Sequence, residues 1–158
     1  MTTSTIFNEK HIYLDKSFEN KNELFHFIAT KLISEGYVEK DYETALKERE
    51  ENFPTGLATE KFGIAIPHCD AIHVKKQCIS FIRMKSPVTF NQMGSISNET
   101  VDCKFAFVLS VKEPSKQVNV LVTLVGLIQD SDFMSELLQS NSETEICNKL
   151  NQKFTGVI

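Results

Sequence analysis

The segment that organises the chain is Phe53-Pro-Thr-Gly-Leu-Ala-Thr-Glu-Lys-Phe-Gly-Ile-Ala-Ile-Pro-His-Cys-Asp-Ala-Ile-His73. Inside it, an apolar run at residues 63–66 stops at Pro67, and His68 follows directly. A short apolar run that ends at a proline predicts a buried strand that meets a turn. Because α/β proteins place their chemistry at the ends of buried strands, we expect His68 at the rim of a sheet.

Two helices are predicted before this segment. Residues 22–35 carry apolar side chains at helical spacing, and Gly36 stands where a helix C-terminal stop belongs. Residues 41–52 predict a second helix with Asp41 as its N-cap, ended by Phe53-Pro54. The last turn of this helix is highly charged, which usually indicates a solvated face. Arg49 in that turn matters for chemistry only if the helix end points toward His68.

The middle of the chain predicts further strands. A short strand is expected within residues 6–14, and residues 78–84 predict another that Ser86-Pro87 breaks before a brief continuation. Residues 91–100 are rich in Ser, Asn and Gly and predict a loop. Residues 101–111 are almost continuously apolar, which is typical of a central strand buried on both faces. Such a strand implies a sheet covered by helices on each side.

Three helices are predicted at the C-terminal end. The first opens at Pro114-Ser115, with Ser115 as N-cap, and runs to Gln129. A short one follows at residues 131–139 with Ser131 as N-cap, and Ser142 opens the last, at residues 143–150. The order of elements therefore predicts an α/β fold, with strands in the middle and helices at both ends.

Length and composition limit the class of protein. The 158 residues predict a single domain over 1–158, and 41% hydrophobic with 24% charged residues is ordinary for a soluble globular protein. A net charge of −4 without a basic run argues against nucleic-acid binding. No signal peptide or spanning segment is recognised, so we expect a cytoplasmic location. The widely spaced cysteines predict reduced, mostly buried thiols: Cys69, Cys78, Cys103 and Cys147.

His68 is open to three chemical uses. Its neutral imidazole could attack phosphorus and carry a phosphoryl group, which requires cationic or hydrogen-bonding groups around the phosphoryl oxygens. It could ligate zinc together with Cys69, His73 and Cys78, although these spacings match no usual zinc pattern. It could act as a general base in a hydrolase, although no G-x-S-x-G nucleophile is present. A purely structural histidine is the common case, but Pro67 fixes the chain direction into His68 and favours a functional reading.

The pattern Arg49-Glu…Thr55-Gly…Ala65-Ile-Pro-His68 resembles the IIA domains of the mannitol/fructose class in the bacterial phosphoenolpyruvate-dependent sugar phosphotransferase system. The string at residues 65–73, with Phe53-Pro-Thr-Gly before it, looks most like the galactitol-specific IIA component. The resemblance runs from the first helix to the last. It implies a mixed, mostly parallel sheet with helices on both faces.

The resemblance also implies a role for single residues. His68 would accept a phosphoryl group, by family resemblance on Nε2, from phospho-HPr and pass it to a cysteine of a IIB component. The membrane IIC component would then take up a sugar alcohol such as galactitol. Arg49 would lie near the phosphate, and Gln117 holds the place of a second family histidine, so both are expected to stabilise it. Thr55 and His73 are candidates for supporting or partner-contact roles.

No metal or organic cofactor is implied, because the phosphoryl group arrives already bound to a protein. An alternative within the same resemblance is a regulatory IIA-like protein of the nitrogen-related branch, which transports no sugar. The pattern around Phe53-Pro54 and Pro67-His68-Cys69 favours the transport role.

Overall fold

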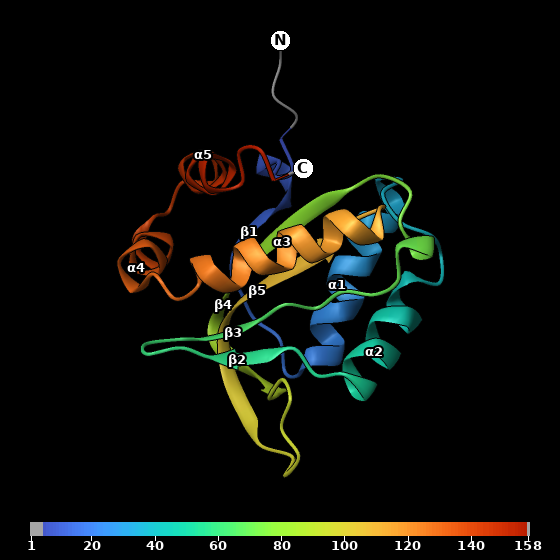
Figure 1. Cartoon of the computed structure of the whole chain (residues 1–158), viewed down its shortest axis with the longest axis horizontal. Coiled ribbons are helices and arrows are strands. Elements are labelled where there is room, and N and C mark those ends of the chain that lie inside the picture. The colour runs from blue at the N-terminus through green and yellow to red at the C-terminus, as the bar shows by residue number, and fades with distance from the viewer. Residues whose placement is uncertain (1–4, 158) are drawn as a thin grey trace.

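In the computed structural model, which describes residues 5–157, the chain folds into one mixed sheet between two layers of helices (Figure 1). The elements in chain order are η1 (Glu9–His11), β1 (Ile12–Lys16), α1 (Lys21–Ser34), α2 (Tyr42–Asn52), β2 (Gly56–Ala58), β3 (Gly63–Ala65), η2 (Ala71–His73), β4 (Cys78–Asn91), β5 (Thr100–Ser110), α3 (Pro114–Leu127), α4 (Ser131–Gln139) and α5 (Glu143–Lys153).

The strand order of the sheet is β1-β4-β5-β3-β2. β4 pairs with β1 in parallel and with β5 in antiparallel orientation, while β3 pairs with β5 in parallel and with β2 in antiparallel orientation. The expected α/β class and mixed sheet are confirmed. The sheet is not mostly parallel, however, because two of its strand pairs are parallel and two are antiparallel. The antiparallel pairs are β2 with β3 and β4 with β5, and strands joined by a short loop run antiparallel.

β4 is one continuous strand, so the predicted break at Ser86-Pro87 is wrong. The pairing of β4 with β5 shifts register between Arg83 and Val88. Pro87 lies inside this irregular part, where its missing N–H costs no ladder hydrogen bond. The predicted strand at residues 101–111 is confirmed as the central strand β5.

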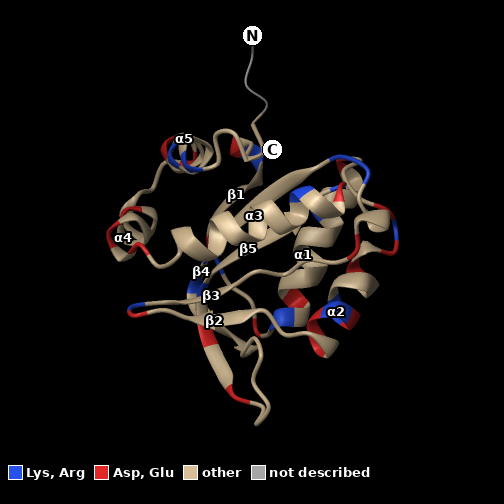
Figure 2. Ribbon diagram, viewed as in Figure 1, with Lys and Arg blue, Asp and Glu red and all other residues tan. Residues whose placement is uncertain are grey.

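Helices cover both faces of the sheet, with α1 and α2 on one side and α3, α4 and α5 on the other (Figure 1). On the first side, Phe25 of α1, Leu46 of α2 and Ala106 of β5 belong to one buried cluster. Both helices were predicted, and Gly36 ends the α1 region with a φ of 79°, a conformation that glycine adopts readily. Figure 2 shows that α2 carries charges of both signs, whereas α3 carries few.

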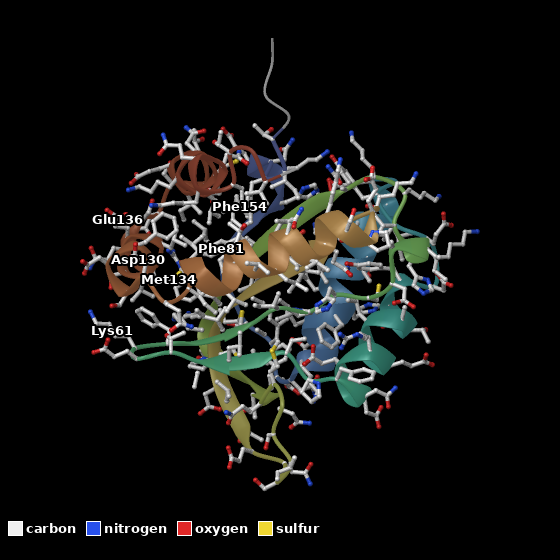
Figure 3. The ribbon with its side chains drawn as sticks, viewed as in Figure 1. Lys61, Phe81, Asp130, Met134, Glu136 and Phe154 are labelled. Atoms are coloured by element: carbon white, nitrogen blue, oxygen red, sulfur yellow. The ribbon has the colours of Figure 1, made fainter. Side chains whose placement is uncertain are left out.

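The second side holds a larger, more aromatic core. Phe81, Met134 and Phe154 lie between the sheet and the C-terminal helices (Figure 3). Phe81 stands edge-on to Phe107, with ring centroids 5.2 Å apart. Alternate residues of β5 face the two cores, which explains why its sequence is apolar without a period of two.

Two predicted helix caps are wrong by one or two positions. The helix α4 begins at Ser131 and is capped by Asp130, whose side chain accepts from the Phe133 N–H at 3.1 Å. Glu113 precedes α3, so Ser115 lies inside the helix and does not cap it. Ser142 caps α5 as predicted, accepting from the Glu145 N–H at 3.1 Å. Aspartate and serine are about equally favoured as N-cap residues, so the sequence alone could not decide which of the neighbouring residues caps α4.

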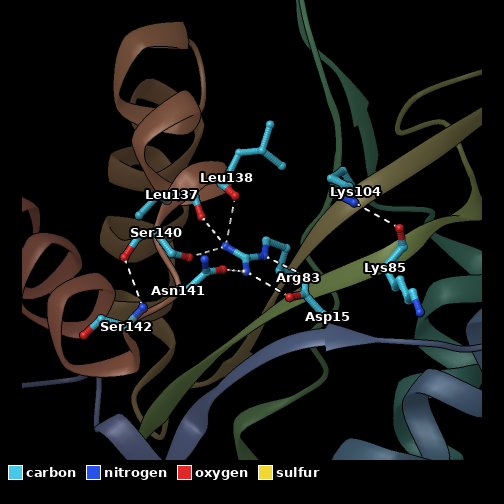
Figure 4. A network of polar contacts seen from close by, with 9 residues as sticks. All are labelled: Asp15, Arg83, Lys85, Lys104, Leu137, Leu138, Ser140, Asn141 and Ser142. Carbon is cyan, nitrogen blue, oxygen red and sulfur yellow. Dashed lines mark hydrogen bonds and ion pairs between the residues drawn. The ribbon is translucent and has the colours of Figure 1, made fainter.

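Arg83 joins the sheet to the far end of the second helical layer (Figure 4). Its guanidinium is buried, pairs with Asp15 at 3.1 Å, and donates to the carbonyl oxygens of Leu137, Leu138 and Ser140. These carbonyls belong to the end of α4 and the turn after it, where backbone acceptors lack helical partners. One side chain therefore holds the α4–α5 turn against β4.

Gly63 is required by the approach of β3 to β5. A Cβ at this position would lie 2.1 Å from the carbonyl oxygen of Asp102, far inside van der Waals contact. We expect Gly63→Ala to lower the free energy of unfolding by about 3 kcal/mol, because the two strands must separate. Gly126→Ala is the matched control, since open space surrounds Gly126 in α3, and it should stabilise by up to about 1 kcal/mol. Urea unfolding of both variants measures the difference; equal stabilities would contradict it.

Candidate functional site

His68 follows β3 after Ile66 and Pro67, at the end of a buried strand as the sequence predicted. It lies beside Leu109 of β5. The Leu109 N–H donates to the carbonyl oxygen of Pro67 at 2.9 Å, and an isolated bridge pairs His68 with Leu109. Only 7% of the His68 surface is exposed. The backbone around the histidine is therefore held by the central strand.

The two ring nitrogens of His68 have different partners. Nδ1 lies 2.8 Å from the carbonyl oxygen of Ile66. A carbonyl oxygen only accepts, so Nδ1 carries the proton of the neutral ring and Nε2 is left unprotonated, as an acceptor. The guanidinium of Arg49 lies at the Nε2 end, with Nη2 3.3 Å away. This arrangement fixes the tautomer and the orientation of the ring.

The surroundings of His68 favour its neutral form. Burial lowers the pKa of His68 below its usual value, and the charge of Arg49 lowers it further. The hydrogen bond to Ile66 and the charge of Asp70 oppose this shift only in part. At neutral pH the ring is uncharged, and a neutral imidazole with a free nitrogen is a nucleophile.

Arg49 is positioned by the end of α2. Its Nη1 donates to the carbonyl oxygen of Phe53 at 2.8 Å, and the guanidinium lies 4.7 Å from the centre of the Phe53 ring. A stacked arginine keeps a fixed plane while still offering N–H donors. The predicted condition for a role of Arg49, that its helix end points toward His68, is therefore met.

An open pocket of about 450 Å³ lies in front of His68 and Arg49. Its lining also includes Pro54, Thr55, the loop after β4 and Leu121 of α3. A phosphoryl group with its oxygens fits such a space, and a second protein can reach into it. The site thus combines a nucleophilic nitrogen, a cation and access from solvent.

Gln117 and Cys69 support the segment behind His68. The Gln117 side-chain amide donates to the carbonyl oxygen of Cys69 at 3.2 Å. Burial raises the pKa of the Cys69 thiol to about 12, so it stays protonated and does not compete as a nucleophile. All four cysteines are buried free thiols, as predicted.

The candidates Thr55 and His73 lie in different places. Thr55 is buried, and its hydroxyl accepts from the Ile66 N–H at 3.2 Å, directly behind the site. His73 lies farther out, with Nδ1 3.0 Å from the Asp41 carboxylate. It lines a shallow hollow of about 210 Å³ that Arg49 and Phe53 also border. The structure brings Thr55 to the histidine and leaves His73 at the margin.

Glu50 is a functional candidate that was not predicted from the sequence. Its carboxylate, 2% exposed, accepts from both the N–H and the hydroxyl of Thr55 at 2.7 Å. A signal was present: Tyr42, Leu46 and Glu50 repeat every four residues, which places all three on the buried face of α2. A carboxylate in such a stripe indicates an internal partner.

The described residues do not support the zinc hypothesis. Within residues 5–157, no three His, Cys, Asp or Glu side chains lie close enough together to hold a metal ion. In the same part of the chain, no helix is both long and apolar enough to cross a bilayer.

Removing the charge of Arg49 tests the electrostatics of the site. We expect Arg49→Gln to raise the pKa of His68 toward its usual 6.5, because the cation beside Nε2 disfavours protonation. NMR titration of the ring carbons measures this directly. Since the folded pKa of the wild-type ring is depressed, its contribution to stability is present above pH 6.5 and is lost as pH falls below it. An unchanged or lower pKa in the variant would contradict the assignment.

Comparison with known proteins identifies the family. Residues 5–153 match the family described as phosphoenolpyruvate-dependent sugar phosphotransferase system, EIIA 2. The galactitol-specific EIIA component of Escherichia coli K12 is 34% identical over 122 residues, which is 77% of this chain and 80% of that protein.

Solved structures agree on the fold. The complex of enzyme IIA mannitol with phosphorylated IIB mannitol from Escherichia coli matches at a TM-score of 0.74 and 22% identity, covering 91% of this chain and 96% of that one. The nitrogen regulatory protein IIA-Ntr of Neisseria meningitidis matches at 0.72 and 26% identity, covering 92% and 96%. The chain therefore belongs to the EIIA 2 family of the phosphoenolpyruvate-dependent sugar phosphotransferase system, and it is a phosphoryl-transferring component.

Proposed function

We propose that His68 is the residue that carries the phosphoryl group, on Nε2, between phospho-HPr and a cysteine of a IIB component. One observation carries the proposal: Nδ1 donates to the carbonyl oxygen of Ile66, whereas Nε2 is unprotonated and accepts from Arg49 at 3.3 Å. The nitrogen that can attack is thus the one at the mouth of the pocket.

The transfer follows from this geometry. The Nε2 lone pair attacks the phosphorus of the HPr phosphohistidine, a P–N bond forms, and the old P–N bond breaks with its electron pair returning to the HPr ring. Nδ1 keeps its proton, so the phosphorylated ring of His68 is cationic, and the Ile66 carbonyl stabilises it. A thiolate of IIB then attacks phosphorus, and His68 leaves as the neutral imidazole. The phosphoryl group arrives activated, so we expect no cofactor requirement.

Arg49 and Gln117 are proposed to hold the phosphoryl oxygens. Arg49 lies 3.3 Å from Nε2 and offers a planar set of N–H donors for a developing negative charge. Gln117 uses one amide hydrogen on Cys69, and its NH₂ group has a second hydrogen available for a phosphoryl oxygen. A neutral amide at this place can donate a hydrogen bond but adds no charge. His73, at the margin, is proposed as a partner contact.

The partners are proposed to dock on exposed apolar side chains around the pocket. Phe53, 63% exposed, and Met93, 37% exposed, line the pocket itself, and Ile96 is exposed in the same loop as Met93. Leu57 and Phe62 are half-buried against the core. Figure 2 shows how little charge α3 carries on this side. A structure exists of IIA mannitol in complex with phosphorylated IIB mannitol, which supports a IIB protein as one partner.

The sugar is proposed to be galactitol or a similar sugar alcohol, because the relative at 34% identity is a galactitol-specific EIIA component. The phosphoryl source, phosphoenolpyruvate, is an intracellular metabolite, so we propose that the protein works in the cytoplasm. The IIC component in the membrane would be reached only through IIB.

The test is incubation with phosphoenolpyruvate, enzyme I and HPr, followed by mass spectrometry and mapping of the phosphoryl group. We expect one phosphoryl group, on Nε2 of His68, and its loss when a IIB protein, membranes that contain the IIC component, and galactitol are added. A protein that gains no phosphoryl group, or gains it elsewhere, would overturn the proposal.

A regulatory role in a nitrogen-related phosphorelay is the second candidate, supported by the match to IIA-Ntr of Neisseria meningitidis. It has less support, because the galactitol-specific relative is more similar in sequence. Phosphorylation of His68 that no IIB protein and no sugar can discharge would favour the regulatory role.

A further inference from the structure

Glu50 is a buried carboxylate that the transfer chemistry does not use. It is 2% exposed, and among the described residues it has no ion pair within 4 Å. Its two oxygens accept from Thr55 instead, one from the N–H and one from the hydroxyl, each at 2.7 Å. Burying an unpaired charge is costly, so a side chain with this arrangement calls for a specific explanation.

The hydrogen bonds continue from Glu50 to His68. Because the Thr55 hydroxyl donates its only hydrogen to Glu50, its oxygen is oriented to accept, and it accepts from the Ile66 N–H at 3.2 Å. The carbonyl oxygen of the same Ile66 accepts from Nδ1 of His68 at 2.8 Å. Ile66 is thus held on both sides, by Thr55 at its nitrogen and by His68 at its oxygen.

We infer that Glu50 is a positioning residue for phosphorylation: through Thr55 it fixes Ile66, whose carbonyl holds Nδ1–H of His68 and keeps Nε2 free. The last turn of α2 then controls both ring nitrogens. Arg49 reaches the Nε2 end directly, and its neighbour Glu50 reaches the Nδ1 end through Thr55. This inference rests on the proposed role of His68 and adds a second residue of α2 to it.

Ionised Glu50 is the form that suits this task. A carboxylate accepts at both oxygens, whereas a carboxamide must place its NH₂ group against one of the two Thr55 donors. Burial raises the pKa of Glu50, and the two bonds from Thr55 oppose the shift. The geometry at Thr55, with a donor at each of the two oxygens, suits the ionised form.

The experiment compares two pairs of variants in the full chain. Glu50→Gln removes one of the two bonds, and Glu51→Gln makes the same charge change at an exposed position of the same helix turn. Thr55→Val removes the hydroxyl while keeping the shape of the side chain, and Thr55→Ser keeps the hydroxyl. The first readout is the tautomer of His68, measured by ¹⁵N NMR of the imidazole in the unphosphorylated protein. The second is the rate of phosphorylation by phospho-HPr, corrected for the folded fraction from unfolding curves.

We expect wild type, Glu51→Gln and Thr55→Ser to show one His68 tautomer, with the proton on Nδ1. Glu50→Gln and Thr55→Val should show a mixture with the Nε2–H form and a phosphorylation rate about ten- to a hundredfold lower, since misplaced reacting groups cost that much. If both variants keep the single tautomer and the wild-type rate per folded molecule, the inference is overturned. The tautomer measurement needs no partner protein. A wild type that is never phosphorylated would therefore remove the proposed function without deciding whether Glu50 positions the ring.

Discussion

Replacing His68 by glutamine is expected to abolish phosphorylation while leaving the fold intact. The glutamine amide nitrogen is not a nucleophile, so no phosphoryl group can be carried, and the rate of sugar phosphorylation in a system with HPr, IIB and IIC should fall at least about a thousandfold. The side chain is similar in length and can still donate to the Ile66 carbonyl, so stability should change by less than about 1 kcal/mol. Mass spectrometry after incubation with phospho-HPr measures the first effect, and thermal unfolding measures the second.

His26→Gln is the matched control for this experiment. His26 is exposed on α1 and bonded to Glu43 at 2.8 Å, away from the pocket in front of His68. This variant should be phosphorylated as fast as wild type. Undiminished labelling of His68→Gln would show that another residue carries the phosphoryl group.

Replacing Arg83 by methionine is expected to give the largest loss of stability among these variants. The substitution leaves the carbonyl oxygens of Leu137, Leu138 and Ser140 without their donor in a largely buried place. Hydrogen bonds to a charged group are worth about 1.5–3 kcal/mol each, and the losses are not additive. We therefore expect the free energy of unfolding to fall by about 4 kcal/mol, measured by urea unfolding.

Asp15→Asn separates the ion pair from the carbonyl contacts. The Asp15 side chain is 56% exposed, and exposed pairs contribute only about 0–1 kcal/mol. Its φ of 55° is a conformation that asparagine also adopts easily, so the backbone should not be strained. We expect a loss below about 1 kcal/mol. An equal loss in Arg83→Met and Asp15→Asn would show that the ion pair, and not the α4–α5 turn, depends on Arg83.

Local chemistry explains what could be predicted. The strand that ends at Pro67, the helix at residues 41–52 and the doubly buried strand at 101–111 are each encoded within a few residues, by proline geometry or by apolar periodicity. The same signals placed His68 at the end of a buried strand. Where local signals compete, they misled: Pro87 was expected to break β4, yet the irregular pairing there accommodates it.

The sequence by itself determined that this chain is an α/β protein with a histidine presented behind Ile66-Pro67, because a proline sets the chain direction without help from distant residues. The tertiary structure alone decided which nitrogen of His68 is unprotonated, which carbonyl Gln117 holds and why Glu50 is buried. These contacts join residues up to 48 positions apart, and they exist only after α2, β3 and α3 have packed around β5. A hydrogen bond between a side chain and the backbone depends on a few tenths of an ångström, which the packing of the sheet and helices sets and the order of residues does not reveal.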